Sequence, residues 1–387
     1  MDDTSRTQTT PTSTGTSTGA TTGRGGPDRD PVLLSGTEHL LAALPHVLGY
    51  HPHRSIVLVA TAAVSPRTPG RRHSVLTARL DLPPEEEAGV VLDAFAGPLA
   101  GVGAEHPGGL LLHVFVHDAP PQVAEAVAAT VRTLAAGGGH VLHDLLLVRE
   151  GRYLPLVADG LAQQPDAGDG TAWRPVPVPA DVPGVADLVL RGRAVLPGRG
   201  DVVAAVRRQD LAAAADTQAA LEDREAGDAD AGTEDHLPAL GRLSRWVVDG
   251  QEEPDAQARA AIVLALADRT LRDAVLARWL PALFSVEEVL TAGPARELRR
   301  RVRPWPAPDA AAALDRLLGI AAAVPRPVAA PLLTVAGVVA WGQGEGTIAN
   351  EAVDLALEVD PGYRMALLVQ AALERGVPPW RRSAHVA

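Results

Sequence analysis

The first half of the chain alternates between short apolar runs and longer amphipathic stretches. Residues 55–61 (SIVLVAT) and 109–116 (GLLLHVFV) are mostly apolar, which is typical of strands covered on both faces. Residues 74–82 instead carry apolar side chains at every second position, so one face of that strand is expected to meet water. Residues 85–104 and 122–136 place apolar side chains at steps of three and four, the spacing of amphipathic helices.

Two further strands are predicted downstream. Residues 141–149 are again mainly apolar, and Glu150 and Gly151 can turn the chain back into residues 152–158. Pro155 removes a hydrogen-bond donor, so this last strand belongs at an edge. Strand, helix, strand, helix, strand predicts a mixed, partly parallel sheet with right-handed crossovers. We assign this sheet to an α/β domain over residues 31–160.

The chain before this sheet has two parts. Residues 1–30 are rich in Thr, Ser and Gly and cannot bury enough apolar area to offset their ordering entropy, so we expect a disordered tail. Ser35 and Glu38 then have the spacing of a capping box, which predicts a helix that opens there and ends before Pro45.

The second half of the chain shows no further strand pattern. Residues 161–183 are rich in Pro, Gly, Asp and Gln, which indicates a linker or a long surface loop. Residues 184–380 are predicted to form an all-helical domain. Within it, residues 328–375 keep the offsets of a tetratricopeptide-like hairpin followed by a capping helix, with small residues at Gly337 and Ala349 where two helices would cross. A single unit of this kind is equally consistent with an ordinary helical hairpin.

Composition removes several kinds of chemistry. All 35 basic residues are arginines, so Schiff-base enzymes and sites that need a phosphate-binding lysine are excluded. The chain has no cysteine, which excludes disulfides, thiolate catalysis and cysteine-ligated metals. It also has neither a Gly-x-Ser-x-Gly nucleophile motif nor a dinucleotide-binding fingerprint. We therefore assign no catalytic residue and predict no cofactor.

The net charge of −12 argues against partners that are themselves anionic. Nucleic acid and anionic membranes would be repelled by the averaged field of the protein. The first 30 residues lack the apolar core of a signal peptide, and the apolar run at residues 328–341 is shorter than the roughly 20 residues that span a membrane. We expect a cytoplasmic protein with no membrane partner.

Histidine is the reactive residue in excess, and ten of the twelve lie between His39 and His143. Two groups flank predicted central strands, and they would share one end of the sheet if those strands run antiparallel. They supply the candidate ligand-binding residues, which are His51, His53, Arg54, His117 and Asp118. Without Arg54 the same set offers nitrogen and carboxylate ligands suited to zinc, manganese or iron. The alternative is a set of loop histidines bonded to backbone carbonyls, with a strand-terminating turn after the second strand.

Three segments carry a family resemblance. Residues 40–60 (LLAALPHVLGYHPHRSIVLVA), 191–199 (RGRAVLPGR) and 341–379 (WGQGEGTIANEAVDLALEVDPGYRMALLVQAALERGVPP) resemble the actinobacterial family known as domain of unknown function 4192. The likeness runs from about residue 32 to residue 380 and implies a cytoplasmic actinobacterial protein, but no activity. It also implies a proline-rich loop that often holds cysteine. Residues 159–183 occupy that place here and contain no cysteine.

These observations favour a non-catalytic protein that binds a protein partner or a small ligand. The alternative is a metal-dependent hydrolase that uses His51, His53, His117 and Asp118 in the α/β domain.

Overall fold

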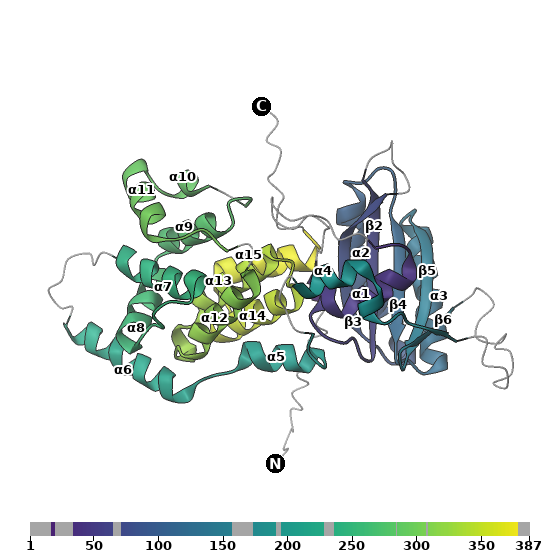
Figure 1. Ribbon diagram of the computed structural model, residues 1–387, viewed down its shortest axis with the longest axis horizontal. Helices are drawn as coiled ribbons and strands as arrows, with labels where there is room; N and C mark the ends of the chain where they lie inside the picture. The colour runs from purple at the N-terminus through teal and green to yellow at the C-terminus, as the bar shows by residue number, and fades with distance from the viewer. Residues whose placement is uncertain are drawn as a thin grey trace, which may run out of the picture.

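The computed structural model describes residues 34–64, 71–156, 173–190, 195–227, 236–283, 285–306 and 309–377, and the backbone of residues 17–19. Most of the predicted tail and most of the predicted linker therefore lie outside the described residues. The described chain forms a sheet flanked by helices, followed by a long helical part (Figure 1). None of the described helices is long and apolar enough to cross a membrane.

The sheet has the order β1-β3-β2-β4-β5-β6-β7, in which β4 and β5 are parallel and all other neighbours are antiparallel. This arrangement confirms the mixed, partly parallel sheet. The strands are β1 (Ser17–Gly19), β2 (Ser55–Ala63), β3 (Arg72–Asp81), β4 (Leu111–His117), β5 (Val141–Arg149), β6 (Arg152–Pro155) and β7 (Arg174–Pro175). Strand β1 comes from the segment predicted to be disordered, and β7 comes from the predicted linker, so both short segments depart from those predictions. Because β7 pairs with Arg152 and Tyr153, β6 is not the edge strand that Pro155 predicted.

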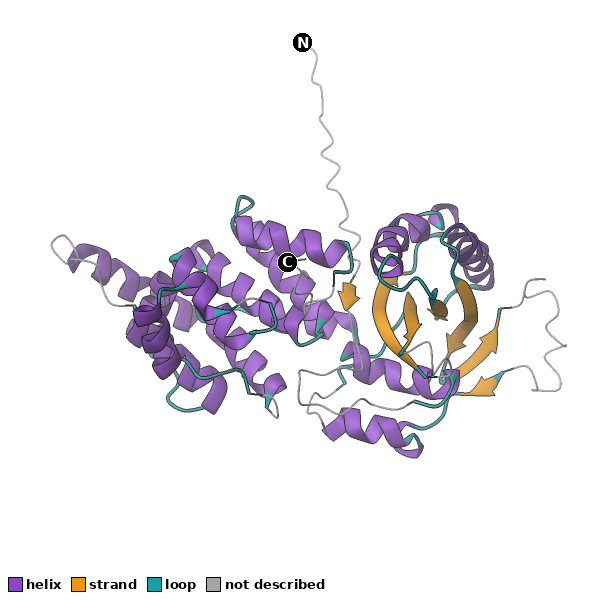
Figure 2. Ribbon diagram, turned by 90° about the horizontal axis from the view of Figure 1, so that it is seen from above, coloured by secondary structure: helices purple, strands orange, loops and turns teal. Residues whose placement is uncertain are grey.

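Helices cover both faces of the sheet (Figure 2). One face packs against α2 (Val90–Gly103) and α3 (Pro121–Gly137), with Leu58, Val114 and Leu147 in its core. The other face packs against α1 (Thr37–Leu48), and α4 (Pro183–Leu190) packs on the outside of α1. Because successive strand residues point to opposite faces, the α1 face takes the alternate positions Val57, Phe115 and Leu146.

Helix α1 differs from its prediction at both ends. It continues through Pro45 to Leu48 and ends at Gly49, whose φ of 80° suits glycine. The buried side chains of Leu41 and Leu44 hold it on the sheet, which offsets the hydrogen bond that Pro45 cannot donate. At its start the N-cap is Gly36, without a side-chain cap. The predicted capping box is therefore wrong, and the Ser35 backbone N–H donates to His39 Nδ1 instead, at 3.3 Å.

The second half of the described chain is helical, as predicted. Its α-helices are α5 (Arg199–Arg207), α6 (Leu211–Gly227), α7 (Leu237–Asp249), α8 (Ala256–Ala267), α9 (Arg269–Trp279), α10 (Val286–Val289), α11 (Ala292–Arg301), α12 (Ala310–Ala322), α13 (Ala330–Gly342), α14 (Gly346–Val359) and α15 (Arg364–Glu374). A Cβ atom on Gly337 of α13 would lie 3.3 Å from the Ala349 carbonyl oxygen of α14, so these two helices do cross closely. The tetratricopeptide likeness of this hairpin stays a prediction.

The loop after α1 is fixed to the helical part. Tyr50 is fully buried in the core of the helical half, where its hydroxyl accepts a hydrogen bond from Thr347 Oγ1 at 3.4 Å. The His51 backbone N–H donates to the Leu196 carbonyl at 3.0 Å, and the Leu196 N–H donates to the Gly49 carbonyl at 2.9 Å. The end of α1 is thereby joined to the second half of the chain.

Candidate functional site

The strand register brings the two predicted histidine groups to one end of the sheet. β2 and β4 are antiparallel neighbours with Ser55 opposite His117, so the residues before β2 and after β4 share an end. There His53 Nδ1 lies 3.2 Å from Asp118 Oδ2, with the two side chains 67% and 33% exposed. This convergence required antiparallel strands, and the structure has them. We call this region the His117 end of β4.

The remaining predicted residues are placed differently. His51 is exposed, and none of the described contacts joins its side chain to His53, His117 or Asp118. Its charge acts instead on His46, whose pKa is lowered first by burial and then by His51. Arg54 and Asp118 both have positive φ, at 40° and 54°. The Asp118 backbone N–H still donates across to the Val148 carbonyl of β5 at 2.9 Å, and β4 ends at His117 with this change of backbone conformation, as the strand-terminating turn of the alternative requires.

Three buried polar side chains at the His117 end have atoms without a hydrogen-bond partner among the described residues. These atoms are Ser55 Oγ, Arg79 Nε and Nη1, and His117 Nε2. Arg79 is 3% exposed, and its Nη2 lies 2.5 Å from Asp81 Oδ1. Burial lowers the pKa of His117 to about 4. The Asp118 charge opposes this shift, while His53 and Arg79 add to it. His117 is therefore neutral at pH 7.

A second polar cluster, absent from the sequence predictions, lies near the other end of β4. His113 Nδ1 of β4 lies 2.5 Å from Asp144 Oδ2 of β5, and His143 Nδ1 lies 3.0 Å from the same oxygen. Thr37, the first residue of α1, donates its hydroxyl to that oxygen as well, at 2.5 Å. We call His113, His143, Asp144 and Thr37 the Asp144 cluster. Its members come from two strands and the helix that covers them.

The hydrogen bonds determine the charge of Asp144. Its side chain is 15% exposed, and burial alone raises the pKa of a carboxyl group. The hydrogen bonds from His113, Thr37 and His143 outweigh burial and lower the pKa to about 2. Asp144 is therefore a carboxylate at neutral pH.

An irregularity in β5 produces this arrangement. Leu112 pairs with Leu142, but His113 pairs with Asp144, so His143 is an extra residue in β5. Such a β-bulge redirects side chains and is rare between parallel strands. In a regular strand His143 and Asp144 would point to opposite faces of the sheet. Here both reach the same place, and the rings of His113 and His143 lie 5.1 Å apart between centroids.

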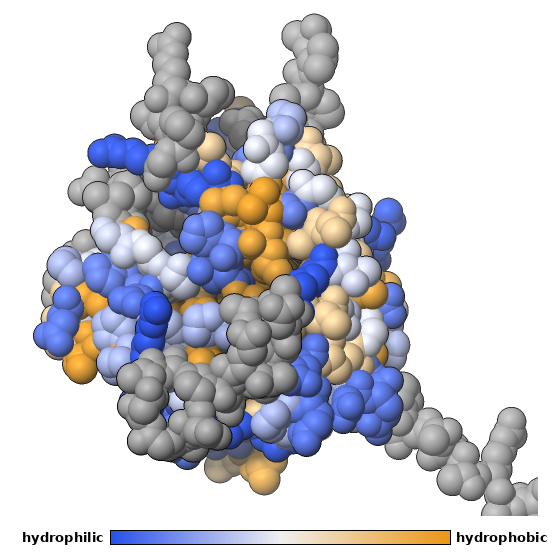
Figure 3. Space-filling view, turned by 90° about the vertical axis from the view of Figure 1, so that its right-hand side faces the viewer, coloured by the Kyte–Doolittle hydropathy of each residue, from blue (hydrophilic) through white to orange (hydrophobic). Residues whose placement is uncertain are grey.

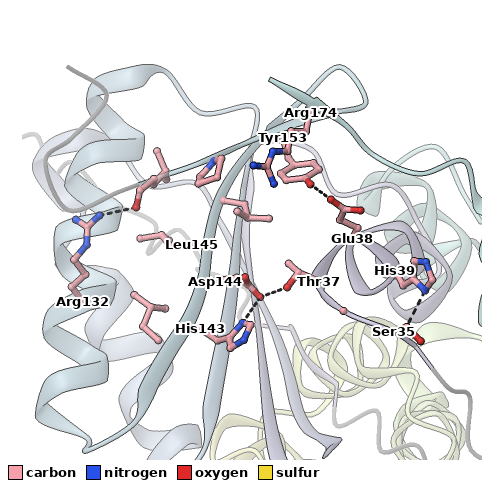
Figure 4. Close-up of a pocket in the computed structure, with 15 residues that line it drawn as sticks. Ser35, Thr37, Glu38, His39, Arg132, His143, Asp144, Leu145, Tyr153 and Arg174 are labelled. Carbon is pink, nitrogen blue, oxygen red and sulfur yellow. Dashed lines mark hydrogen bonds and ion pairs between the residues drawn. The ribbon is translucent and has the colours of Figure 1, made fainter. Parts of the chain in front are cut away.

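Thr37, His143 and Asp144 of this cluster form part of the wall of an open pocket of about 580 Å³. β6 pairs with residues 146–149 of β5, so the first half of β5 lies at an edge of the sheet, and the pocket opens there. Figure 4 shows Thr37, His143 and Asp144 on one side of β5, and Arg132 of α3 on the other. The pocket is lined by Ser35, Gly36, Thr37, Glu38, His39, Arg132, Leu142, His143, Asp144, Leu145, Leu146, Tyr153, Pro155, Leu156 and Arg174. We call it the α1–β5 pocket.

The α1–β5 pocket combines charged and apolar groups. The Tyr153 hydroxyl donates to Glu38, and Arg132 Nη2 donates to the Leu156 carbonyl at 2.9 Å. The edge that carries β5 and β6 faces the viewer in Figure 3, where apolar surface lies between hydrophilic side chains. Such a mixture suits a ligand that has both polar and apolar parts.

One sequence signal for the Asp144 cluster was available. His113 interrupts the apolar run GLLLHVFV, and His143-Asp144 interrupts the next run. Polar side chains inside strands that are otherwise covered on both faces need partners, because an unpaired buried polar group is costly. The pairing partner, however, depends on the β5 register, which the bulge shifts by one residue.

A family model described as Domain of unknown function (DUF4192) matches residues 38–380. No curated protein and no solved structure matches the chain.

Proposed function

The chain belongs to the DUF4192 family. From the geometry of its own residues we propose that it is a cytoplasmic, non-catalytic protein that binds a small ligand with polar and apolar parts in the α1–β5 pocket. The observation that carries this proposal is the convergence of charged and apolar side chains from α1, α3, β5, β6 and β7 on one cavity.

The pocket offers the contacts that small ligands use. Glu38, Asp144 and Arg174 supply charges of both signs, and Leu142 and Leu145 supply apolar surface. The open edge of β5 adds backbone donors and acceptors that no strand of the described sheet uses. A concave site with a few converging polar groups on a rigid scaffold is the usual form of a small-molecule site.

The other predicted functions have less support. A hydrolase built on His51, His53, His117 and Asp118 would need all four to meet, and His51 has no described contact with the other three. Binding of a protein partner by the helical half rests on the tetratricopeptide likeness, which stays a prediction. We therefore propose the ligand role first.

A pocket-filling variant tests this proposal. Leu142→Trp adds an indole at the pocket wall, and Leu211→Trp makes the same change at a side chain on α6 with 75% exposure. Each full-length protein is incubated with the small-molecule extract, below about 1 kDa, of the cells that produce it. The protein fraction is then separated by rapid ultrafiltration and its small molecules are measured by mass spectrometry.

We expect one class of molecule to be enriched by the wild-type protein and by Leu211→Trp, and its enrichment to fall at least tenfold in Leu142→Trp. If nothing is enriched by the wild-type protein, or if all three proteins enrich the same molecules equally, the pocket is not a ligand site.

A further inference from the structure

We propose that His113, His143 and Asp144 bind one divalent transition-metal ion, of the class of Zn²⁺, on the wall of the α1–β5 pocket. These three side chains form the one group of metal-ligand type found among the described residues, and one ligand atom from each lies within 4.8 Å of the others. The site differs from the set that sequence alone suggested.

The distances are close to those of a coordinated ion. Zn²⁺ binds imidazole nitrogen and carboxylate oxygen at about 2.0–2.2 Å in tetrahedral geometry, so atoms that share one ion lie about 3.4 Å apart. His143 Nδ1 is 3.0 Å from Asp144 Oδ2, and His113 Nδ1 is 2.5 Å from the same atom. An ion would need His113 Nδ1 to move away from Asp144 Oδ2 by roughly 1 Å, and His143 Nδ1 by roughly 0.4 Å.

The bulge in β5 is an independent reason for this inference. Without the extra residue His143, the β5 side chain next to Asp144 would point to the α2–α3 face of the sheet. With it, two adjacent residues of one strand converge with His113 of the neighbouring strand. Bulges are found next to functional sites because they redirect a side chain in this manner.

The donor set indicates the class of ion. Imidazole nitrogens favour zinc, iron, nickel or copper, whereas calcium and magnesium prefer sites made of oxygen alone. Two histidines and one carboxylate leave coordination positions open to a further ligand. The His143 side chain is 52% exposed, so these positions would be reached from the pocket.

Thr37 supports the site from outside the coordination sphere. Its hydroxyl donates to Asp144 Oδ2 at 2.5 Å, and α1 lies beside the cluster (Figure 4). Partners of this kind orient a metal ligand and typically change metal affinity by about 10- to 100-fold. Thr37 is therefore a positioning residue.

A purely structural role is the competing explanation. Asp144 then accepts hydrogen bonds from Thr37 and two histidines, and the cluster holds α1 on the sheet. Both explanations account for the hydrogen bonds around Asp144, so only a measurement of ion binding separates them.

This proposal rests on the proposed function in one respect, since the ion would lie at the wall of the same pocket, which His143 and Asp144 line. It does not depend on finding the organic ligand. Titration with Zn²⁺ alone detects the ion, and failure of the extract experiment would leave that titration unaffected.

The experiment uses full-length protein with any affinity tag removed, treated with a chelator and dialysed. Isothermal titration with Zn²⁺ gives the stoichiometry and affinity, and Co²⁺ supplies visible absorption bands that report nitrogen coordination. The variant is His143→Ala, since a half-exposed side chain can be truncated without opening a core cavity. The matched control is His53→Ala, which removes a histidine whose Nδ1 also contacts an aspartate, at the His117 end.

We expect one ion per wild-type chain, unchanged binding in His53→Ala, and affinity reduced by roughly 100-fold or more in His143→Ala. Ca²⁺ in excess should not displace the ion. Less than a tenth of an equivalent bound by folded wild-type protein would overturn the proposal. So would equal affinities in wild type and His143→Ala.

Discussion

The two ends of β4 carry histidines on the same face of the sheet, yet their surroundings differ. At the His113 end, Asp144 accepts hydrogen bonds from three side chains, and β5 is bulged to bring one of them there. At the His117 end, buried atoms of Ser55, Arg79 and His117 have no partner among the described residues, and the contact between His53 and Asp118 is partly exposed. At the His113 end the polar side chains form a hydrogen-bonded network around Asp144. At the His117 end several buried polar atoms take part in no such network among the described residues.

The difference shows that closeness in sequence is a poor guide to a site. His51, His53, His117 and Asp118 stand out because they cluster in two short segments. His113 and Asp144 are 31 residues apart, but they are partners in adjacent strands. Burial of a carboxylate is costly unless several donors form hydrogen bonds with it, and those donors come from elements that are neighbours in space.

The largest effect should come from neutralising the aspartate at the His113 end. Asp144→Asn removes the charge that three donors share, and we expect the free energy of unfolding to fall by about 3 kcal/mol in chelator-treated protein. The same change at the other end, Asp118→Asn, removes a carboxylate with one exposed partner and should cost less than about 1 kcal/mol. Asparagine also tolerates the positive φ of Asp118.

Urea unfolding followed by circular dichroism measures both variants. Equal losses at the two ends would contradict the distinction between a satisfied and an unsatisfied cluster.

A pH-dependent effect should distinguish the His117 end. Burial, opposed in part by Asp118 and reinforced by His53 and Arg79, lowers the pKa of His117 from 6.5 to about 4. Between pH 6.5 and pH 4 the unfolded chain therefore binds a proton at His117 and the folded chain does not. Protonation then favours the unfolded chain, so the free energy of unfolding is highest above pH 6.5 and falls as the pH is lowered. Between pH 7.5 and pH 5 this decrease amounts to about 2 kcal/mol.

The variant His117→Asn should lack this part of the pH dependence. Unfolding free energies measured at both pH values, with a chelator present, compare it with the wild-type protein. An identical pH dependence in the two proteins would show that His117 gains a partner for its proton in the folded state.

The smallest effect should come from Arg79. Its Nε and Nη1 have no described partner, and its one ion pair is to Asp81, whose side chain is 52% exposed. Arg79→Met fills a similar volume without polar atoms, so stability should stay within about 1 kcal/mol of the wild type or rise. A loss above about 2 kcal/mol in thermal or urea unfolding would mean that both nitrogens are bonded in solution.

The strands and helices of the α/β half were largely predictable because their side-chain periods are clear. Residues 55–61, 109–116 and 141–149 all became strands. Residues 74–82 also became a strand, but the expectation that its polar face meets water was wrong, because Thr77 and Arg79 are buried. The start and end of α1 were not predicted correctly. The capping box and Pro45 are local sequence signals, and the packing of Leu41 and Leu44 against the sheet overrode them. The pairing of Ser17–Gly19 with β3 was also missed, because its composition matches the rest of the tail.

The candidate site was predictable only in part. The sequence predicted that His53 and Asp118 share one end of the sheet if β2 and β4 are antiparallel. The two strands are antiparallel, and the two side chains are in contact. The Asp144 cluster needed the register of β5 against β4, and nothing in the sequence around His143 marks the extra residue. A bulge is decided by which pairing buries the most apolar surface across both strands, so it is a property of the whole sheet.

Helix α1 links the α1–β5 pocket to the helical half mechanically. Its first residue, Thr37, is bonded to Asp144, and two residues after its last turn Tyr50 is sealed in the other core. A helix of 12 residues is a stiff rod of about 18 Å. A displacement of Thr37 along this rod must either bend it at Pro45 or push Tyr50 against its neighbours. A ligand or ion that displaced Thr37 would therefore couple occupancy of the pocket to the packing of the helical half, and such a coupling acts equally in both directions.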